Sequence, residues 1–585
     1  MWRRMIAVLT LAALLTPVPA AQAGRHETVR GWTILSDSDA GADAVIAAAR
    51  PYRINHLQLS HEIVYDLREV RDPRKQAQTN RLTESAHRAG VKEVAVWDHA
   101  LYGLDYYPRR FRTGPGGTID LDNPEFWAWF KQDYRSMLDL VPGTDAVVLT
   151  FIETGARVER QYSAKLKTDA EKLAYLVDQV ADVVVDERER NLYLRTFGYF
   201  PAEIERTVEA IGLVEHRDGI RVMAKAVPHD FFMTHPNDRW VQAIDRPTII
   251  EFDTAGEYNG QGKIAGAWPE EHVNRWRYYE QLPNVIGYTA RTDRYGESRI
   301  VGTPTELNLY ALHRATQSRY LPVDLMYWEY AIKTYGWLAA ARVQSALRRS
   351  FDIVTSSLYT LGTNNANHSK LDYEPYCSSY HRSVPGKWID PPVVTVGHDV
   401  NRGFHDWIDI VDHLAPASCK TDGILRREAG YVLDNGWVKP GNNMEPAYLD
   451  HIVAEKNWSV RQAEASLADI EAANRFLRPE QYRQLKGYFE RTLFTVKLHR
   501  SVAKAYFGYR IWVRGESFQN PALQRAIWDG LTEARQVAAQ MRGYPERAAT
   551  GEWNWIVDAD QADLYYTRIS AGWDRYGNVK VPPPS

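Results

Sequence analysis

Eight short apolar runs, separated by helical segments, dominate the first half of the chain. They cover residues 31–37, 54–60, 92–100, 145–151, 191–197, 220–227, 248–253 and 284–290. Each run is almost continuously apolar, which is typical of parallel strands covered on both faces. Eight such units within about 290 residues predict an α/β protein of the (β/α)8 TIM barrel type. A doubly wound open sheet gives a similar alternation, but it usually carries a glycine-rich phosphate loop after its first strand. Residues 36–43 match such a loop only weakly.

The character of the chain changes after about residue 320, where long amphipathic segments replace the strand-like runs. Residues 360–440 are rich in Asn, His, Tyr, Pro and Gly and are typical of loops. We therefore predict a barrel over residues 24–320 and a loop-rich, mainly α-helical C-terminal domain over residues 321–585. In this arrangement the loop-rich part could close over the mouth of the barrel.

Local signals predict where two helices begin. Asn123 followed by Pro124 suits a helix start, because asparagine caps helix N-termini and proline fits the first helical position. Ser459 and Gln462 have the spacing of a capping box and predict a second start.

The N-terminus has the three parts of a secretory signal peptide. Two arginines (Arg3 and Arg4), an apolar run (residues 5–15) and a small-residue site (Ala21-Gln22-Ala23) follow one another. The run is too short to span a bilayer. We therefore predict a signal peptide over residues 1–23 and a secreted or periplasmic mature protein without a membrane span.

Charge and cysteine content narrow the classes of partner. The chain has 71 Lys+Arg against 74 Asp+Glu, a net charge of −3, and no basic block, so nucleic-acid binding is not expected. Cys377 and Cys419 could form a disulfide in an oxidising compartment or remain buried thiols. No cluster has a convincing metal-ligand spacing, and we expect neither a metal ion nor a cofactor.

Carboxylates and arginines, together with two histidines and one tryptophan, stand where the predicted strands end. The positions are Trp97, Asp98, His99, Glu153, Arg195, His229, Asp230, Asp253, Glu257, Arg291, Asp293 and Arg294. In a TIM barrel these strand ends form the active-site face. Carboxylates converging there suit glycoside hydrolysis, in which one acid protonates the leaving oxygen and one carboxylate activates water. The alternative is a merely polar rim whose acids cap the following helices.

The chain resembles glycoside hydrolase family 67, the α-glucuronidases that act on xylan-derived oligosaccharides. The similarity is strongest in residues 225–276, where a Pro-x-Asp-Phe segment precedes a strand and a Glu-Tyr-x-Gly-Gln element. Further matching segments are residues 118–130, 287–315 and 361–370. The resemblance implies that Glu153 is the general acid and that Asp230 and Glu257 activate the water. It also implies inversion of configuration. A general acid must be protonated near neutral pH, so we expect the apolar strand behind Glu153 and nearby carboxylates to raise its pKa.

The same resemblance implies a set of substrate-binding residues. Arg195 matches an arginine that contacts the uronic acid, and we expect Trp97, His99, Tyr258, Arg157, Arg291 and His368 to contribute to the sugar site. Two departures stand out. Leu149 occupies the place of a family lysine that contacts the sugar carboxylate, and the predicted barrel starts directly after the signal peptide, without the family's accessory domain. Arg157, Arg160, Arg195 or Arg291 could replace the lysine's charge, since arginine binds carboxylates in a bidentate manner.

Three functions fit these observations. The first is a secreted, inverting α-glucuronidase-like exo-glycosidase that acts on an oligosaccharide or polysaccharide. The second is a glycosidase with the same frame that removes a different sugar. The third is a non-catalytic carbohydrate-binding barrel, which the three filled carboxylate positions disfavour.

Overall fold

The computed structural model describes residues 27–198, 201–228, 230–233, 237–296, 298–360, 363–364, 367–371, 432–434, 437–439, 446–513, 519–544, 555–573 and 578–585. The predicted signal peptide and both cysteines, Cys377 and Cys419, lie outside these ranges. Secretion and the disulfide therefore stay predictions.

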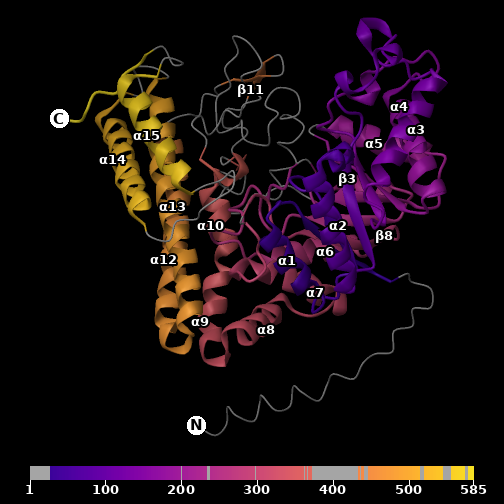
Figure 1. The fold of residues 1–585 in the computed structure, drawn as a ribbon. Coiled ribbons are helices and arrows are strands. Elements are labelled where there is room, and N and C mark those ends of the chain that lie inside the picture. The colour runs from indigo at the N-terminus through magenta and orange to yellow at the C-terminus, as the bar shows by residue number, and fades with distance from the viewer. Residues whose placement is uncertain are drawn as a thin grey trace.

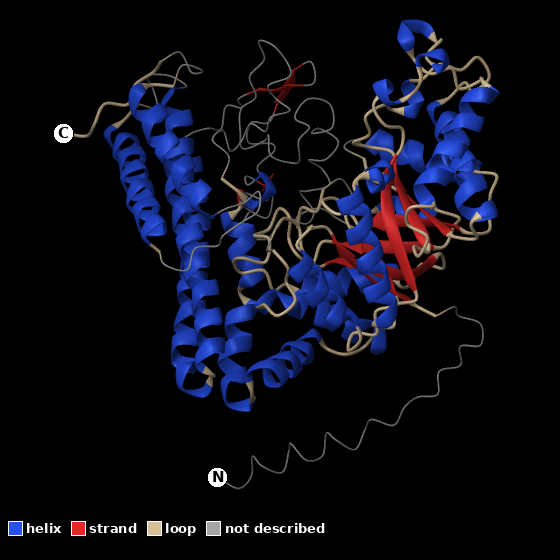
Figure 2. Cartoon of the chain, in the orientation of Figure 1, coloured by secondary structure: helices blue, strands red, loops and turns tan. Residues whose placement is uncertain are grey.

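Eight parallel strands close into a barrel in the order in which they occur in the chain (Figure 2). They are β1 (Val29–Ile34), β2 (His56–Leu59), β3 (Glu93–His99), β4 (Ala146–Thr150), β5 (Asn191–Arg195), β6 (Ile220–Lys225), β7 (Thr248–Phe252) and β8 (Val285–Arg291). The pairing of β1 with β8 closes the sheet. Each strand falls on one of the eight predicted runs, so the predicted barrel is confirmed and the open sheet is excluded.

Helices surround the barrel and connect its strands. They are α1 (Asp39–Ala49), α2 (Pro73–Arg88), α3 (Pro124–Leu138), α4 (Asp169–Ala181), α5 (Pro201–Leu213), α6 (Pro269–Tyr279) and α7 (Leu307–Gln317). The side chain of Asn123 accepts a hydrogen bond from the Glu125 backbone N–H, so the predicted start of α3 is confirmed. Between β6 and β7 the described residues form the 3₁₀ helix η8 (Arg239–Ala243).

A helical C-terminal region follows the barrel, as predicted. Its helices are α8 (Val323–Tyr335), α9 (Trp337–Arg348), α10 (Ser350–Ser357), α12 (Pro446–Ala473), α13 (Pro479–Val513), α14 (Pro521–Gly543) and α15 (Trp555–Ala571). Two short hairpins pair β9 (Tyr359–Thr360) with β10 (Thr363–Asn364) and β11 (Val432–Asp434) with β12 (Trp437–Lys439). Figure 1 shows α12–α15 as a bundle beside the barrel, with α8–α10 between the two. None of the helices in the described ranges is both long and apolar enough to cross a membrane.

The predicted helix start at Ser459 is wrong. Helix α12 already begins at Pro446, and Ser459 is fully buried in its middle. Its hydroxyl donates to the Ile353 carbonyl of α10 (3.0 Å) rather than to a helix N-terminus. The serine therefore joins two helices, which the capping-box spacing alone could not reveal.

Mainly hydrophobic side chains, from alanine to tryptophan in size, fill the middle of the barrel. The inner cluster consists of Ala95, Trp97, Ala146, Val148, Tyr193, Met223 and Ile249. Leu149, between two inner positions of β4, belongs instead to the cluster shared with the surrounding helices and is fully buried. Because strand side chains alternate in direction, Leu149 faces the surrounding helices and not the barrel interior.

A polar network closes the N-terminal end of the barrel. Glu93 accepts hydrogen bonds from the Tyr193 hydroxyl (2.6 Å) and from Asn191, and it lies 2.7 Å from His56 Nδ1. Burial alone would raise the pKa of Glu93, but His56, Arg221 and Tyr193 lower it to about 2. The ionised carboxylate is thus stabilised in the folded state.

Acid should weaken this end of the barrel. Because the folded pKa of Glu93 lies below the ordinary value of 4.5, its stabilisation is complete above that pH and is lost as the pH falls toward 2. Replacing Glu93 with glutamine should flatten this part of the stability profile and cost about 1.5–3 kcal/mol at pH 7, as for hydrogen bonds to charged groups. Urea unfolding of both proteins between pH 2 and pH 7 measures this, and parallel profiles would contradict it.

Candidate active site

On four neighbouring strands, the last side chain that faces the barrel interior is charged. Arg195, Lys225, Glu251 and Arg291 stand on β5, β6, β7 and β8, and Lys225 is in register with Glu251. All four are buried. Parallel strands bring their C-terminal ends to one face of a barrel, so these residues form the floor of its mouth.

Glu251 links two arginines at this floor. One of its carboxylate oxygens lies 2.8 Å from Arg195 Nε, and the other accepts from Arg291 Nε at 2.9 Å. Burial would raise the pKa of Glu251, but Arg195, Arg291 and Lys225 lower it to about 2. The carboxylate is therefore ionised, and it fixes both guanidinium groups.

Glu257 extends this ion network upward from the loop after β7. Its carboxylate lies 2.6 Å from Arg291 Nη1 and 2.7 Å from Arg294 Nε. These arginines and His368 hold its pKa well below the usual range, although burial opposes them. Asp253 supports the same loop by accepting the backbone N–H groups of Gly256 (3.0 Å) and Glu257 (2.7 Å). Burial raises the pKa of Asp253 to about 6.

Asp230 follows β6 and reaches the same network. It lies 3.3 Å from Lys225 Nζ. The Lys225 ammonium also lies over the rings of Phe231 (3.8 Å) and Phe197 (4.4 Å), and burial lowers the pKa of Lys225 to about 8. Two of the three carboxylates predicted from the sequence, Asp230 and Glu257, thus lie at the mouth on neighbouring ion pairs, since Lys225 is in register with Glu251.

Glu153 stands on a separate turn after β4. The strand ends at Thr150, and Glu153 is exposed with a left-handed backbone (φ +63°). The Tyr65 hydroxyl donates to its carbonyl (3.1 Å). The turn passes close to the loop after β3, since a Cβ on Gly155 would lie 2.4 Å from the Gly103 nitrogen. The expected strand end is therefore corrected to an exposed turn beyond the strand.

Two predicted sugar-binding residues are covered. Trp97 is fully buried, its ring N–H donates to Gln58 (3.1 Å), and the Arg195 guanidinium lies 4.9 Å from its ring. His99 is only 1% exposed and stacks against Tyr65 with 3.8 Å between ring centres. Trp97 belongs to the cluster that fills the barrel interior, whereas His99 lies against Tyr65 of the loop after β2. Sugar contact by Trp97 and His99 therefore stays a prediction, and in the structure Trp97 packs against Arg195 and His99 against Tyr65.

Arg157 is placed in another cluster. Its guanidinium bonds Glu159 (2.7 Å) and Glu203 of α5 (2.7 Å). These two carboxylates occupy its guanidinium group. Among the described residues, no hydrogen bond or ion pair joins Arg157 to Glu251 or Glu257. Of the arginines that could replace the charge of the family lysine, Arg195 and Arg291 lie at the mouth, whereas Arg157 pairs with Glu159 and Glu203.

The C-terminal region contributes one predicted residue. His368 Nε2 lies 3.4 Å from Glu257 and 3.4 Å from the Tyr258 hydroxyl, and its ring stacks on Tyr258 with 5.0 Å between centres. Tyr258 is itself buried. The structure thus brings Tyr258 and His368 together beside Glu257, as one edge of the mouth.

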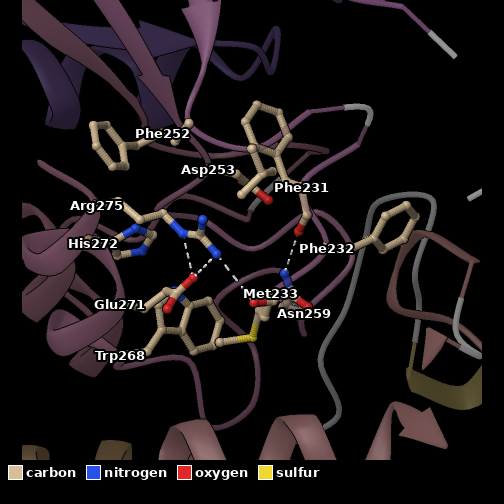
Figure 3. Close-up of a pocket in the computed structure, with 12 residues that line it drawn as sticks. Phe231, Phe232, Met233, Phe252, Asp253, Asn259, Trp268, Glu271, His272 and Arg275 are labelled. Atoms are coloured by element: carbon tan, nitrogen blue, oxygen red, sulfur yellow. Dashed lines mark hydrogen bonds and ion pairs between the residues drawn. The ribbon is translucent and has the colours of Figure 1, made fainter. Parts of the chain in front are cut away.

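A small cavity lies behind Phe231, between the loop after β6, the end of β7 and α6 (Figure 3). Phe252, Trp268 and Arg275 are among its lining residues, and Arg275 donates to the Met233 carbonyl (3.3 Å). Its volume of about 30 Å³ matches a water molecule rather than a sugar ring. The cavity is therefore too small to hold a sugar ring.

Lys225 and Glu251 were missed as site residues in the sequence. Each interrupts an otherwise apolar run near its C-terminal end, at the inner positions of "IRVMAKAV" and "TIIEFD". A buried charge within a strand is expensive unless it is paired. That cost is the signal that could have identified both.

One group in the described residues has metal-ligand geometry. The ligand atoms of Asp182, Asp186 and His216 lie within 4.8 Å of one another. The group stands on the π-helix η7 (Asp182–Glu187) before β5 and on the loop before β6, at the end of the barrel opposite the mouth. Lys131 already pairs with Asp182 (2.9 Å) and Asp178 with His216 (2.8 Å).

Comparison with known proteins shows similarity at the level of the fold. No family model matches the chain. No curated protein sequence matches it. Among solved structures, the chain is similar to a GH138 enzyme targeting pectin rhamnogalacturonan II, with a TM-score of 0.53 and 11% identity over 88% of this chain and 63% of that one. The chain thus spans less than two thirds of that neighbour's length.

Two further structures match more loosely. They are a GH115 4-O-methyl-α-glucuronidase with specificity for decorated arabinogalactans (TM-score 0.48, 11% identity, 96% of this chain and 63% of that one) and the D120N mutant of the Thermobaculum terrenum O-GlcNAc hydrolase (0.44, 10%, 93% and 94%). The GH138 neighbour supports a fold of the glycoside hydrolase type, and it does not single out family 67.

Proposed function

We propose that the protein is a glycoside hydrolase that removes a terminal α-linked uronic acid from an oligosaccharide or polysaccharide. The observation that carries this proposal is the ion network at the barrel mouth, in which Asp230 and Glu257 lie among Lys225, Arg291 and Arg294. The barrel, which the GH138 enzyme shares in fold, supports the same class of chemistry. The family resemblance of residues 225–276 adds the sugar class.

Arg195 is the residue suited to bind the carboxylate of the sugar. Its Nε is used by Glu251 (2.8 Å), and within the described ranges its two terminal nitrogens have no hydrogen-bond partner. A guanidinium fixed at one nitrogen presents the other two as a planar fork, which matches a carboxylate. Trp97 and Phe197, 4.9 Å and 5.0 Å from the guanidinium, keep the fork in place.

The reaction divides between three carboxyl groups. Glu153, exposed on its turn at the mouth, donates a proton to the glycosidic oxygen as the bond from that oxygen to the anomeric carbon breaks. A water attacks the anomeric carbon from the opposite side and loses its proton to Asp230, with inversion. Glu257 is a poor proton acceptor because its pKa is lowered by Arg294, Arg291 and His368. It therefore accepts a hydrogen bond from the water and orients it.

Substrate charge provides the test. The wild type should hydrolyse 4-nitrophenyl α-glucuronide in preference to the neutral 4-nitrophenyl α-glucoside and α-xyloside. Replacing Arg195 with glutamine should lower kcat/KM for the uronide by about 10–100-fold, as expected for loss of a charged hydrogen bond, and should change the neutral substrates much less. Release from a neutral glycoside alone would overturn the uronic acid assignment.

Two further variants sharpen this test. Arg195→Lys keeps the charge without the fork and should recover part of the preference. Arg221→Gln removes an inner arginine at the other end of the barrel and should leave the preference unchanged. If Arg157→Gln removed the preference instead of Arg195→Gln, the assignment of Arg195 would be wrong.

A further inference from the structure

A buried tyrosine of the C-terminal region connects the two loops that carry Asp230 and Glu257. Tyr359, the first residue of β9, is fully buried. Its hydroxyl donates to Asn259 Oδ1 (2.6 Å) and accepts from the Met233 backbone N–H (2.9 Å). Met233 lies three residues after Asp230, and Asn259 lies two residues after Glu257.

Asn259 completes this bridge. Its Nδ2 donates to the Phe231 carbonyl (3.1 Å), and Figure 3 shows both residues at the cavity behind the mouth. The loop after β6 is therefore held to the loop after β7 at two backbone positions, directly by Asn259 and through the Tyr359 hydroxyl. A buried network whose members are all hydrogen-bonded is rigid.

Ser369 fixes one of the two loops separately. Its buried hydroxyl donates to the Glu257 carbonyl (2.7 Å) and accepts from the Gly260 backbone N–H (2.8 Å). It makes no hydrogen bond to the loop after β6 among the described residues. Ser369 thus acts on the backbone of the loop after β7 alone, whereas Tyr359 acts on both loops.

The helical bundle holds these two hydroxyl groups in place. Lys456 of α12 donates to the carbonyls of Ser356 and Ser357 (3.2 Å each), at the end of α10, and to that of Tyr359. The Leu371 N–H, two residues after Ser369, donates to Asp558 of α15 (2.8 Å). The bundle therefore reaches the mouth through short buried connections.

We infer that Tyr359 is a positioning residue that fixes the separation of Asp230 and Glu257. The inference rests on the proposed function, in which these carboxylates handle one water. The space between the two must fit that water, and a shift of about 1 Å in a catalytic group costs about 100-fold in rate. Without the hydroxyl, the Met233 N–H and Asn259 Oδ1 lose a buried partner, so the two loops are free to move apart.

The test compares Tyr359→Phe with a matched control. Tyr509 in α13 is also fully buried, and its hydroxyl also makes two hydrogen bonds, donating to the Val579 carbonyl (2.9 Å) and accepting from the Trp573 backbone N–H (2.9 Å). Tyr509→Phe therefore removes a buried, doubly bonded hydroxyl that makes no hydrogen bond to the described residues of either loop. Hydrogen–deuterium exchange of the full chain should be faster in the peptides that contain Met233 and Asn259 for Tyr359→Phe and unchanged there for Tyr509→Phe.

Kinetics on the 4-nitrophenyl α-glucuronide supply the second measurement. Tyr359→Phe should lower kcat about 10–100-fold with little change in KM, and Tyr509→Phe should leave both unchanged. Azide needs no deprotonation and should restore part of the loss in Tyr359→Phe by forming the glycosyl azide as 4-nitrophenolate leaves. A general loss of stability would not respond to azide.

Each result decides between distinct conclusions. Unchanged exchange in both peptides of Tyr359→Phe overturns the inference, as does faster exchange with an unchanged kcat. Ser369→Ala should speed exchange only in the peptide that contains Asn259, and an equal effect on both peptides would contradict the separation of roles. If the wild type hydrolyses none of the glycosides, the proposed function fails, while the exchange data still decide whether Tyr359 holds the two loops together.

Discussion

Replacing Glu153 with glutamine is expected to lower kcat by about 10²–10⁴-fold on glycosides with a poor leaving group, because a general acid contributes a factor of this size. Glutamine keeps the size of the side chain but cannot donate a proton to the glycosidic oxygen. The loss should shrink for aryl glycosides whose phenolate leaves without protonation. Steady-state rates on a series of aryl α-glucuronides with increasing leaving-group pKa measure this dependence.

Glu189 offers a matched control for Glu153. It is also exposed and also has a left-handed backbone (φ +54°), but it lies just before β5, at the opposite end of the barrel. Glu189→Gln should therefore show wild-type rates throughout the series. A uniform loss for Glu153→Gln, independent of the leaving group, would assign Glu153 to binding rather than to acid catalysis.

Replacing Glu251 with glutamine should be the most destabilising change at the mouth. Glu251 is fully buried between Arg195 (2.8 Å) and Arg291 (2.9 Å). Removing one partner of a buried ion pair leaves uncompensated charge and costs about 3–5 kcal/mol. We expect this loss in the free energy of unfolding at pH 7, measured by urea unfolding.

The pH dependence identifies the cause of that loss. The pKa of Glu251 is lowered to about 2 from an ordinary value of 4.5, so its stabilisation is complete above that value and is lost as the pH falls through 2. The difference between wild type and Glu251→Gln should be constant at neutral pH and should shrink in acid. A difference that did not vary with pH would indicate a packing defect.

Glu251→Gln should also lower the preference for the uronide, because Arg195 loses the carboxylate that fixes its guanidinium group. Glu93→Gln should destabilise the protein without affecting that preference.

Local patterns in the sequence were sufficient to predict the barrel. All eight apolar runs became strands, and Asn123 with Pro124 begins α3 as expected. The same local reasoning failed at Ser459, where the spacing of a capping box occurs inside a longer helix. The difference is physical: a strand's apolar run reflects burial on both faces, whereas a capping signal depends on where the preceding chain already forms a helix.

The residues of the candidate site could be predicted from the sequence in part, because strand ends are visible in the sequence and side-chain pairing is not. Strand ends and motif order pointed to Asp230, Glu257, Arg291 and Arg195. In the structure Glu251 and Arg291 join Arg195 to Glu257 through ion pairs. Asp230 pairs separately with Lys225, which is in register with Glu251. The covered positions of Trp97 and His99 and the separate pairing of Arg157 follow from which way each side chain points once the sheet has closed.

The sequence by itself determined the eight strands, their order and the residues that stand at their ends, because periodicity and chain order are local properties. Only the tertiary structure decided which charges pair, that Leu149 faces the helices, and that Tyr359, about 100 residues beyond Glu257, reaches the loops of both candidate carboxylates. These contacts join segments far apart in the chain. Their partners are chosen by barrel closure and by the need to satisfy every buried charge and hydroxyl group.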